Sequence, residues 1–68
     1  MRIAYDPQTD ALSMAISQQT VARSMEPASG VILNFGAEGT LVSVDLMGVT
    51  RWLGREAIAR IVIDLSRL

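Results

Sequence analysis

Apolar and polar residues alternate through much of the first two-thirds of the chain, and a period of two is typical of β-strands. The clearest case is the segment 11–17, in which the large apolar side chains occupy every second position. Residues 2–5 alternate in the same way, and the segment 6–10 between the two runs is dense in turn-forming residues. The pattern therefore predicts two strands joined by a turn.

A second pair of strands is predicted further along the chain. Residues 30–35 are apolar on both faces, and residues 40–47 alternate again. The segment between them contains two glycines, which permit the positive φ angles that tight hairpin turns require. Residues 21–25 alternate only weakly and precede Pro27, which cannot donate to a ladder, so they form an edge strand at most. We therefore expect an antiparallel β-meander of about four strands.

Beyond a connection at residues 49–53, the spacing of the apolar residues lengthens to that of a helix. From residue 54 or 55 they recur at steps of one, three, one, three and three, at Ala57, Ile58, Ile61, Val62, Leu65 and Leu68. This stripe predicts one C-terminal amphipathic helix. Residues 61–65 are also rich in β-branched side chains, so a fifth strand is the alternative to the favoured helix. The expected fold class is α+β, in a single domain over residues 1–68.

The size of the chain predicts self-association. A chain of 68 residues hides only about 60% of its unfolded surface when it folds, so its core is thin. It contains no cysteine and no histidine, which excludes disulfides and Cys/His zinc sites as sources of stability. A hydrophobic fraction of 50% is high for so small a body. We therefore expect a homodimer or a higher homo-oligomer.

The predicted helix supplies the candidate interface. Its apolar stripe is flanked by a single tryptophan, a residue type that either packs over a core as a lid or dominates a protein interface. The residues expected to make protein contacts are Trp52, Ile58, Ile61, Val62 and Leu65. A face of the sheet is the alternative contact surface.

Composition excludes several other function classes. Without histidine and cysteine, the chain lacks the Ser-His-Asp and Cys-His nucleophile systems and an imidazole base, so we predict no catalytic residue and no cofactor. Three aromatic rings are too few for a platform that stacks nucleic-acid bases. No apolar run approaches the roughly 20 residues that span a bilayer. We expect a non-enzymatic, cytoplasmic protein without a membrane partner.

Three carboxylates carry the metal-binding or hydrolytic alternative. Asp6 and Asp10 flank the first predicted turn, and Asp45 lies in a strand that is expected to pair nearby, so their oxygens would suit a hard cation. Aspartate at a turn, however, ordinarily accepts hydrogen bonds from backbone N–H groups. Asp45, in an otherwise apolar strand, is expected to pair with an arginine or to face solvent. We therefore predict structural roles and no metal site.

Arginine provides all six cations, and lysine none. Guanidinium groups suit interfaces and phosphates, although a GC-rich genome produces the same bias. Residues Arg51, Arg55 and Arg60 lie on or near the predicted helix and form the candidate nucleic-acid surface. A net charge of −1 provides no general attraction to phosphate backbones, so nucleic-acid binding is the weakest of the alternatives.

Three motifs read in order resemble the small bacterial family of unknown function DUF2283. They are Tyr5-Asp6 followed by Asp10-Ala11-Leu12, the stretch Gly30-Val31-Ile32-Leu33-Asn34-Phe35 with Gly39, and Val42-Ser43-Val44-Asp45-Leu46. The resemblance covers roughly residues 1–53. The chain departs from the family pattern at Asn34, Ser43 and Asp45, where aspartate, glycine and glutamate are usual.

The resemblance implies a compact meander of four strands with a helix, and no established reaction. Members of this family are often encoded beside small toxin-like proteins of the RelE type. It therefore also implies an antitoxin-like or partner-binding role, with a small toxin as the expected partner.

Overall fold

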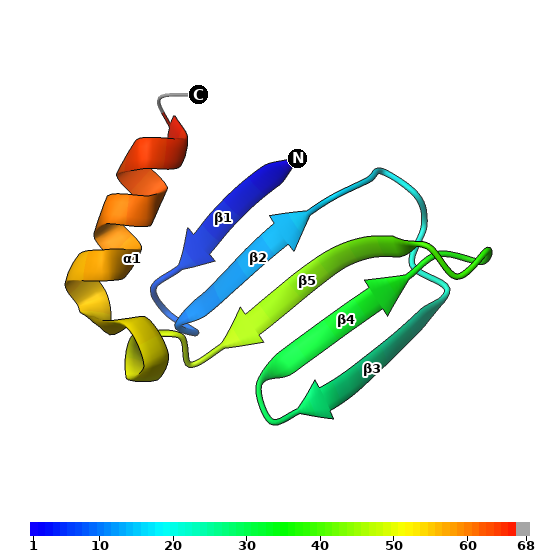
Figure 1. Ribbon diagram of the computed structural model, residues 1–68, viewed down its shortest axis with the longest axis horizontal. Helices are drawn as coiled ribbons and strands as arrows, with labels where there is room; N and C mark the ends of the chain where they lie inside the picture. The colour runs from blue at the N-terminus through cyan, green and yellow to red at the C-terminus, as the bar shows by residue number, and fades with distance from the viewer. Residues whose placement is uncertain (67–68) are drawn as a thin grey trace.

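A computed structural model describes the backbone of residues 1–66 and the side chains of residues 1–60. The described chain forms one antiparallel sheet and one helix, which confirms the α+β class (Figure 1). The elements are β1 (Arg2–Asp6), β2 (Ala11–Ala15), β3 (Arg23–Ala28), β4 (Val31–Phe35), β5 (Leu41–Met47) and α1 (Thr50–Ser66). None of the described helical residues forms a segment long and apolar enough to cross a membrane.

The sheet has five strands where about four were predicted. The additional strand is β3, which includes Pro27 and pairs with β4 through a register shift between Met25 and Ala28. Proline is tolerated here because β3 is an edge strand, whose outward N–H positions need no ladder partner. The weak alternation of residues 21–25 therefore marks a real strand that begins and ends two or three residues later than its sequence pattern.

The order of the strands is β1-β2-β5-β4-β3, which corrects the predicted meander. After β2 the chain crosses to the far edge, and β3, β4 and β5 then return toward β2 (Figure 1). The pairs Leu12–Leu46 and Met14–Val44 lie opposite each other across the β2–β5 boundary. Apolar cross-strand pairs stabilise a sheet, and this order places two of them at its centre.

The register divides the sheet into an apolar and a polar face. One cross-sheet row contains only apolar side chains, namely Ile3, Met14, Val44, Leu33 and Met25. A second row on the same side contains Tyr5, Leu12, Leu46 and Val31. We call these two rows together the apolar face. The opposite side, the polar face, contains Arg2, Ser13, Ser24, Asn34, Ser43 and Asp45 among smaller and apolar residues.

The core lies at one end of the sheet, where α1 approaches it. Leu12, Val49 and Ile58 form the buried cluster, and Ile3, Tyr5 and Leu46 pack against it. Within the described residues, the backbone of α1 runs close to β1 and to no other strand. Figure 1 shows the helix beside β1, with β5, β4 and β3 lying away from it. The apolar face is therefore covered only near its β1 end.

α1 begins earlier than the sequence spacing predicts and is broken by glycine. Residues 50–53, expected to be a connection, form a first helical turn, and Gly54 follows with φ 78° and ψ 160° before the helix continues to Ser66. A fifth strand at residues 61–65 is therefore wrong, because these residues continue the helix. Their side chains lie outside the described residues, so the amphipathic character of the helix stays a prediction.

We expect Gly54→Ala to destabilise the protein. Its backbone conformation is essentially restricted to glycine, so an L side chain costs about 1–3 kcal/mol of unfolding free energy or straightens the helix and moves Ile58 away from Leu12. Urea denaturation measures this loss, with the exposed Glu56→Ala as a control expected to change stability by less than about 0.5 kcal/mol. Equal or greater stability of Gly54→Ala would show that the helix runs straight through this position.

Candidate functional site

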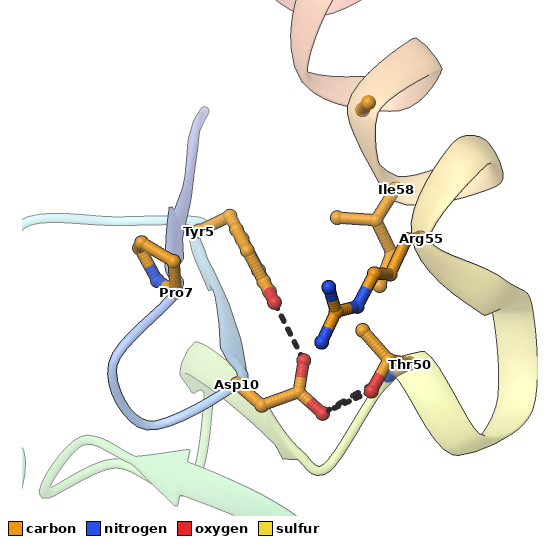
Figure 2. A pocket seen from close by; sticks show the side chains of 7 residues that line it. Tyr5, Pro7, Asp10, Thr50, Arg55 and Ile58 are labelled. Atoms are coloured by element: carbon orange, nitrogen blue, oxygen red, sulfur yellow. Dashed lines mark hydrogen bonds between the residues drawn. The ribbon is translucent and has the colours of Figure 1, made fainter.

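The carboxylate of Asp10 joins the first turn of the sheet to the start of the helix. Its Oδ1 accepts a hydrogen bond from the Tyr5 hydroxyl at 2.6 Å. Its Oδ2 accepts one from the Thr50 hydroxyl at 2.6 Å and one from the Thr50 backbone N–H at 3.2 Å. Figure 2 shows the three side chains converging from β1, the β1–β2 turn and α1. We call Tyr5, Asp10 and Thr50 the Asp10 network.

Local backbone geometry explains why an aspartate occupies this position. Asp10 has a φ of 54°, in the left-handed region, which aspartate tolerates better than most residues. Its carbonyl oxygen accepts hydrogen bonds from the N–H groups of Gly48 and Val49 at 2.8 and 3.2 Å. Its carboxylate acts as an N-cap of α1, because it accepts a hydrogen bond from the first N–H of the helix. Asp10 and this N–H group, which belongs to Thr50, are 40 residues apart in the sequence.

These hydrogen bonds shift two pKa values in opposite directions. The Thr50 hydroxyl, followed by the Tyr5 hydroxyl, stabilises the ionised carboxylate and lowers the pKa of Asp10. The hydrogen bond to Asp10, followed by desolvation, favours the neutral phenol and raises the pKa of Tyr5, although Arg55 acts in the opposite direction. Around neutral pH the network is therefore held as a neutral phenol donating to a carboxylate.

A pocket of about 680 Å³ opens beside this network, between the β1–β2 turn and α1. Its lining residues are Tyr5, Pro7, Asp10, Thr50, Arg55, Ile58 and Ala59 (Figure 2). Apolar side chains from both elements form most of its wall, and Arg55 is the cation on its rim. The pocket exists because α1 stands beside β1, with its first turn fixed by Asp10.

A second polar cluster lies on the polar face of the sheet, around Asn34. This side chain is only 8% exposed. Its amide donates to Ser43 Oγ at 2.9 Å and to Asp45 Oδ2 at 3.0 Å, and its oxygen accepts from the Ser24 hydroxyl at 2.6 Å. The cluster thus links β3, β4 and β5. Asp45 was expected to meet an arginine or solvent, and its partner here is a neutral amide.

The structure does not bring the three candidate metal ligands together. Asp10 belongs to the network at the helix start, Asp45 belongs to the cluster around Asn34, and Asp6 accepts a hydrogen bond from the Gln8 N–H of its own turn at 2.9 Å. In the part of the chain that the structure describes, no three acidic side chains form a group able to hold a metal ion. Asp6 and Asp10 accept hydrogen bonds from backbone N–H groups, as turn aspartates ordinarily do, whereas among the described residues Asp45 accepts one from the Asn34 amide and not from an arginine.

The candidate interface residues occupy different environments. Ile58 is 3% exposed and packs in the core, so it is not available on an outer surface of this chain. Trp52 is 51% exposed and therefore does not close over the core as a lid. The side chains of Ile61, Val62 and Leu65 lie outside the described residues.

The three candidate phosphate-binding arginines also differ from one another. Arg51 folds back on its own turn, with Nε 3.5 Å from the Gly48 carbonyl oxygen. Arg55 lines the pocket, and Arg60 is exposed further along the helix. Nucleic-acid binding by these three residues stays a prediction.

Sequence reasoning missed Thr50 and the use of Tyr5 and Arg55 at a common pocket. An aspartate at the end of a turn signals hydrogen bonding to nearby N–H groups, and this chemistry is correct for Asp10. Nothing in local spacing, however, indicates that the N–H groups belong to residues 48–50. Only the strand order places the two segments side by side.

We expect Asp10→Asn to destabilise the protein in a pH-dependent way. Asparagine presents an NH₂ group where one carboxylate oxygen now accepts, so the urea midpoint at pH 7 should fall. The folded-state pKa of Asp10 is lowered, so its stabilising contribution is complete above the unfolded-state value near 3.8 and is lost as the pH falls through the folded-state value. The difference in urea midpoint between wild type and Asp10→Asn should therefore shrink below about pH 4.

The matched control for this measurement is Asp6→Asn in the same turn. Its carboxylate has one exposed hydrogen bond within the turn, so we expect a small change in the urea midpoint at pH 7. If the difference in urea midpoint between wild type and Asp10→Asn stayed constant from pH 7 to about pH 3, this would contradict a stabilising role of the Asp10 charge.

We expect Asn34→Ala to cost about 1–3 kcal/mol of unfolding free energy, because it removes the partner of Ser43, Asp45 and Ser24 in a nearly buried position. Ser24→Ala, which removes one of the same hydrogen bonds from an exposed position, should cost less than about 1 kcal/mol. Chemical denaturation of both variants makes the comparison. Similar losses would show that the cluster does not depend on its central amide.

Comparison with known proteins agrees with the sequence motifs. The family model described as "Protein of unknown function (DUF2283)" matches residues 2–49, which include all five strands and the residue before α1. No curated protein and no solved structure matches the chain significantly. The matched segment contains Tyr5 and Asp10 as well as Asn34 and Asp45, but not Thr50 or Arg55. The chain belongs to the DUF2283 family of proteins of unknown function.

Proposed function

We propose that this protein is a self-associating interaction module, in which two copies pack the apolar faces of their sheets together. The observation that carries the proposal is the part of the apolar face that α1 leaves uncovered. Met25 on β3 is 48% exposed, and Ile16, which continues the alternation of Leu12 and Met14, is 45% exposed. Leu33 and Val44 between them are only partly buried.

The shape of the chain supports this proposal. The molecule measures 37 × 29 × 16 Å, so it is thin in one direction. A sheet with an apolar face ordinarily packs against a second layer of strands or helices. Over β5, β4 and β3, none of the described residues supplies that layer. Only Leu12, Val42, Val49 and Ile58 count as buried apolar side chains among them, which is a small core for a stable domain.

A second copy of the chain suits this face. Two sheets pack about 10 Å apart with their apolar side chains interdigitated, as in a β-sandwich. In a dimer of this kind the uncovered strands β5, β4 and β3 would form the centre of the interface and the residues around them its margin. A two-fold axis brings identical patches together, so an uncharged apolar patch is complementary to itself. The net charge of −1 opposes this pairing only weakly.

Charged residues lie at the margin of the proposed interface. The two apolar rows contain no charged side chain. Arg23, at the start of β3, lies over the Phe35 ring at 5.3 Å from its centroid, which covers part of that ring. An apolar centre with a cation at its rim is typical of protein–protein interfaces.

Other roles have less support from the geometry. The separation of Asp6, Asp10 and Asp45 removes the common point that a metal-dependent or hydrolytic activity would need. The helix residues Trp52, Ile61, Val62 and Leu65 as contacts, and a small toxin-like protein as a partner, stay predictions. We therefore propose a non-enzymatic role, with a second copy of the chain as the partner.

Sedimentation from about 1 to 200 µM tests the proposal, and we expect the mass to rise from monomer to dimer and the melting temperature to rise with concentration. Met25→Glu places a charge on the apolar face at a position half-exposed in the single chain. It should weaken the dimer at least about tenfold, because the carboxylate loses water in the interface.

The matched control is Ala15→Glu, which places the same charge on an exposed position of the polar face. It should leave the dissociation constant within about twofold of wild type. A monomer throughout the concentration range, or equal weakening by both variants, would overturn the proposal.

A further inference from the structure

The pocket beside the Asp10 network has the size and lining of a small-molecule site. Its volume of about 680 Å³ falls within the range of roughly 300–1,000 Å³ that ligand pockets occupy. The apolar wall is formed by the Tyr5 ring and Pro7 on one side and by Ile58 on the other (Figure 2), and Ala59 of the same helix also lines the pocket. An apolar body of a ligand would pack between the turn and the helix.

The carboxylate at the base of the pocket is already engaged. Three donors, the Tyr5 hydroxyl and both the hydroxyl and the N–H of Thr50, satisfy the two oxygens of Asp10. Both hydroxyl hydrogens already take part in hydrogen bonds to Asp10, so neither Tyr5 nor Thr50 has a free O–H to donate to a ligand. A ligand must therefore find its hydrogen-bond donors elsewhere in the pocket.

Arg55 is that donor. Figure 2 shows its guanidinium directed from α1 toward the Tyr5 hydroxyl and the Asp10 carboxylate, with no hydrogen bond drawn between Arg55 and the residues of the network. It lies in the first turn after Gly54, the end of a helical segment where a cation is unfavourable to the helix dipole. Stabilisation of the helix does not explain this position. A guanidinium with five donors is well suited to hold a carboxylate through two parallel hydrogen bonds.

We propose that this pocket binds a small amphipathic monocarboxylate, with the carboxylate on Arg55 and the apolar body between Pro7 and Ile58. The ionised Asp10 limits the charge that a ligand can carry, because a dianion such as phosphate would be repelled more strongly than a monoanion. The apolar wall in turn selects a carboxylate with a hydrocarbon or aromatic body. This site uses the helix side of β1, so it does not depend on the proposed dimer.

A titration of the full chain followed by ¹H–¹⁵N spectra tests this site, with 4-phenylbutyrate as the probe and 4-phenylbutan-1-ol as its uncharged analogue. We expect the carboxylate to bind at least about tenfold more tightly than the alcohol. The largest changes should fall on the amides of Tyr5, Ile58 and Ala59. Equal affinity for the two compounds, or no saturable change with either, would overturn the proposal.

Two exposed arginines on the same helix give a matched pair of variants. Arg55→Gln should reduce the affinity for 4-phenylbutyrate to that for the alcohol, whereas Arg60→Gln should leave it within about twofold of wild type. Circular dichroism verifies that both variants keep the wild-type fold. If Arg55→Gln bound 4-phenylbutyrate with unchanged affinity, the carboxylate would lie elsewhere and the assignment would be overturned. Spectral changes centred on Met25 and Leu33, away from the pocket, would overturn it as well.

Discussion

A single helix cannot cover a five-stranded sheet, and the rest of this structure depends on that constraint. A helix is about 10 Å wide and strands are spaced about 4.8 Å apart, so one helix covers about two strands. Here α1 lies at the β1 end, where Ile58 and Val49 bury Leu12. The strands β5, β4 and β3 keep one apolar side without cover from the described chain. Hydrophobic burial is the main favourable term in folding, and this uncovered side is the surface that the proposed dimer would bury.

The position of the helix is in turn set by Asp10. Its carbonyl oxygen holds Gly48 and Val49, and its carboxylate holds Thr50, so one residue fixes the whole passage from β5 into α1. The same carboxylate orients the Tyr5 hydroxyl. A residue that reads as an ordinary turn aspartate is therefore the link between the sheet, the helix and the pocket between them.

The sequence predicted the elements better than their arrangement. Alternation located β2 and β5, a continuous apolar run located β4, and the longer spacing located the helix, because these patterns reflect contacts within one element. It did not predict that β5 lies between β2 and β4, nor that Asp10 meets Thr50, because both depend on contacts between distant segments. The Asn34 cluster was hidden for the same reason, since Ser24, Asn34 and Asp45 share a face only once the register is known.

The edges of the sheet limit the size of the proposed assembly. An exposed strand edge can recruit further copies without limit and build fibres. On one edge, β3 carries Pro27 and an irregular register, which interrupt the regular row of backbone donors such growth requires. On the other, α1 stands beside β1 (Figure 1). In the proposed dimer, association would be directed to the flat face, where a pair closes on itself, and the complex would be of finite size in place of an open filament.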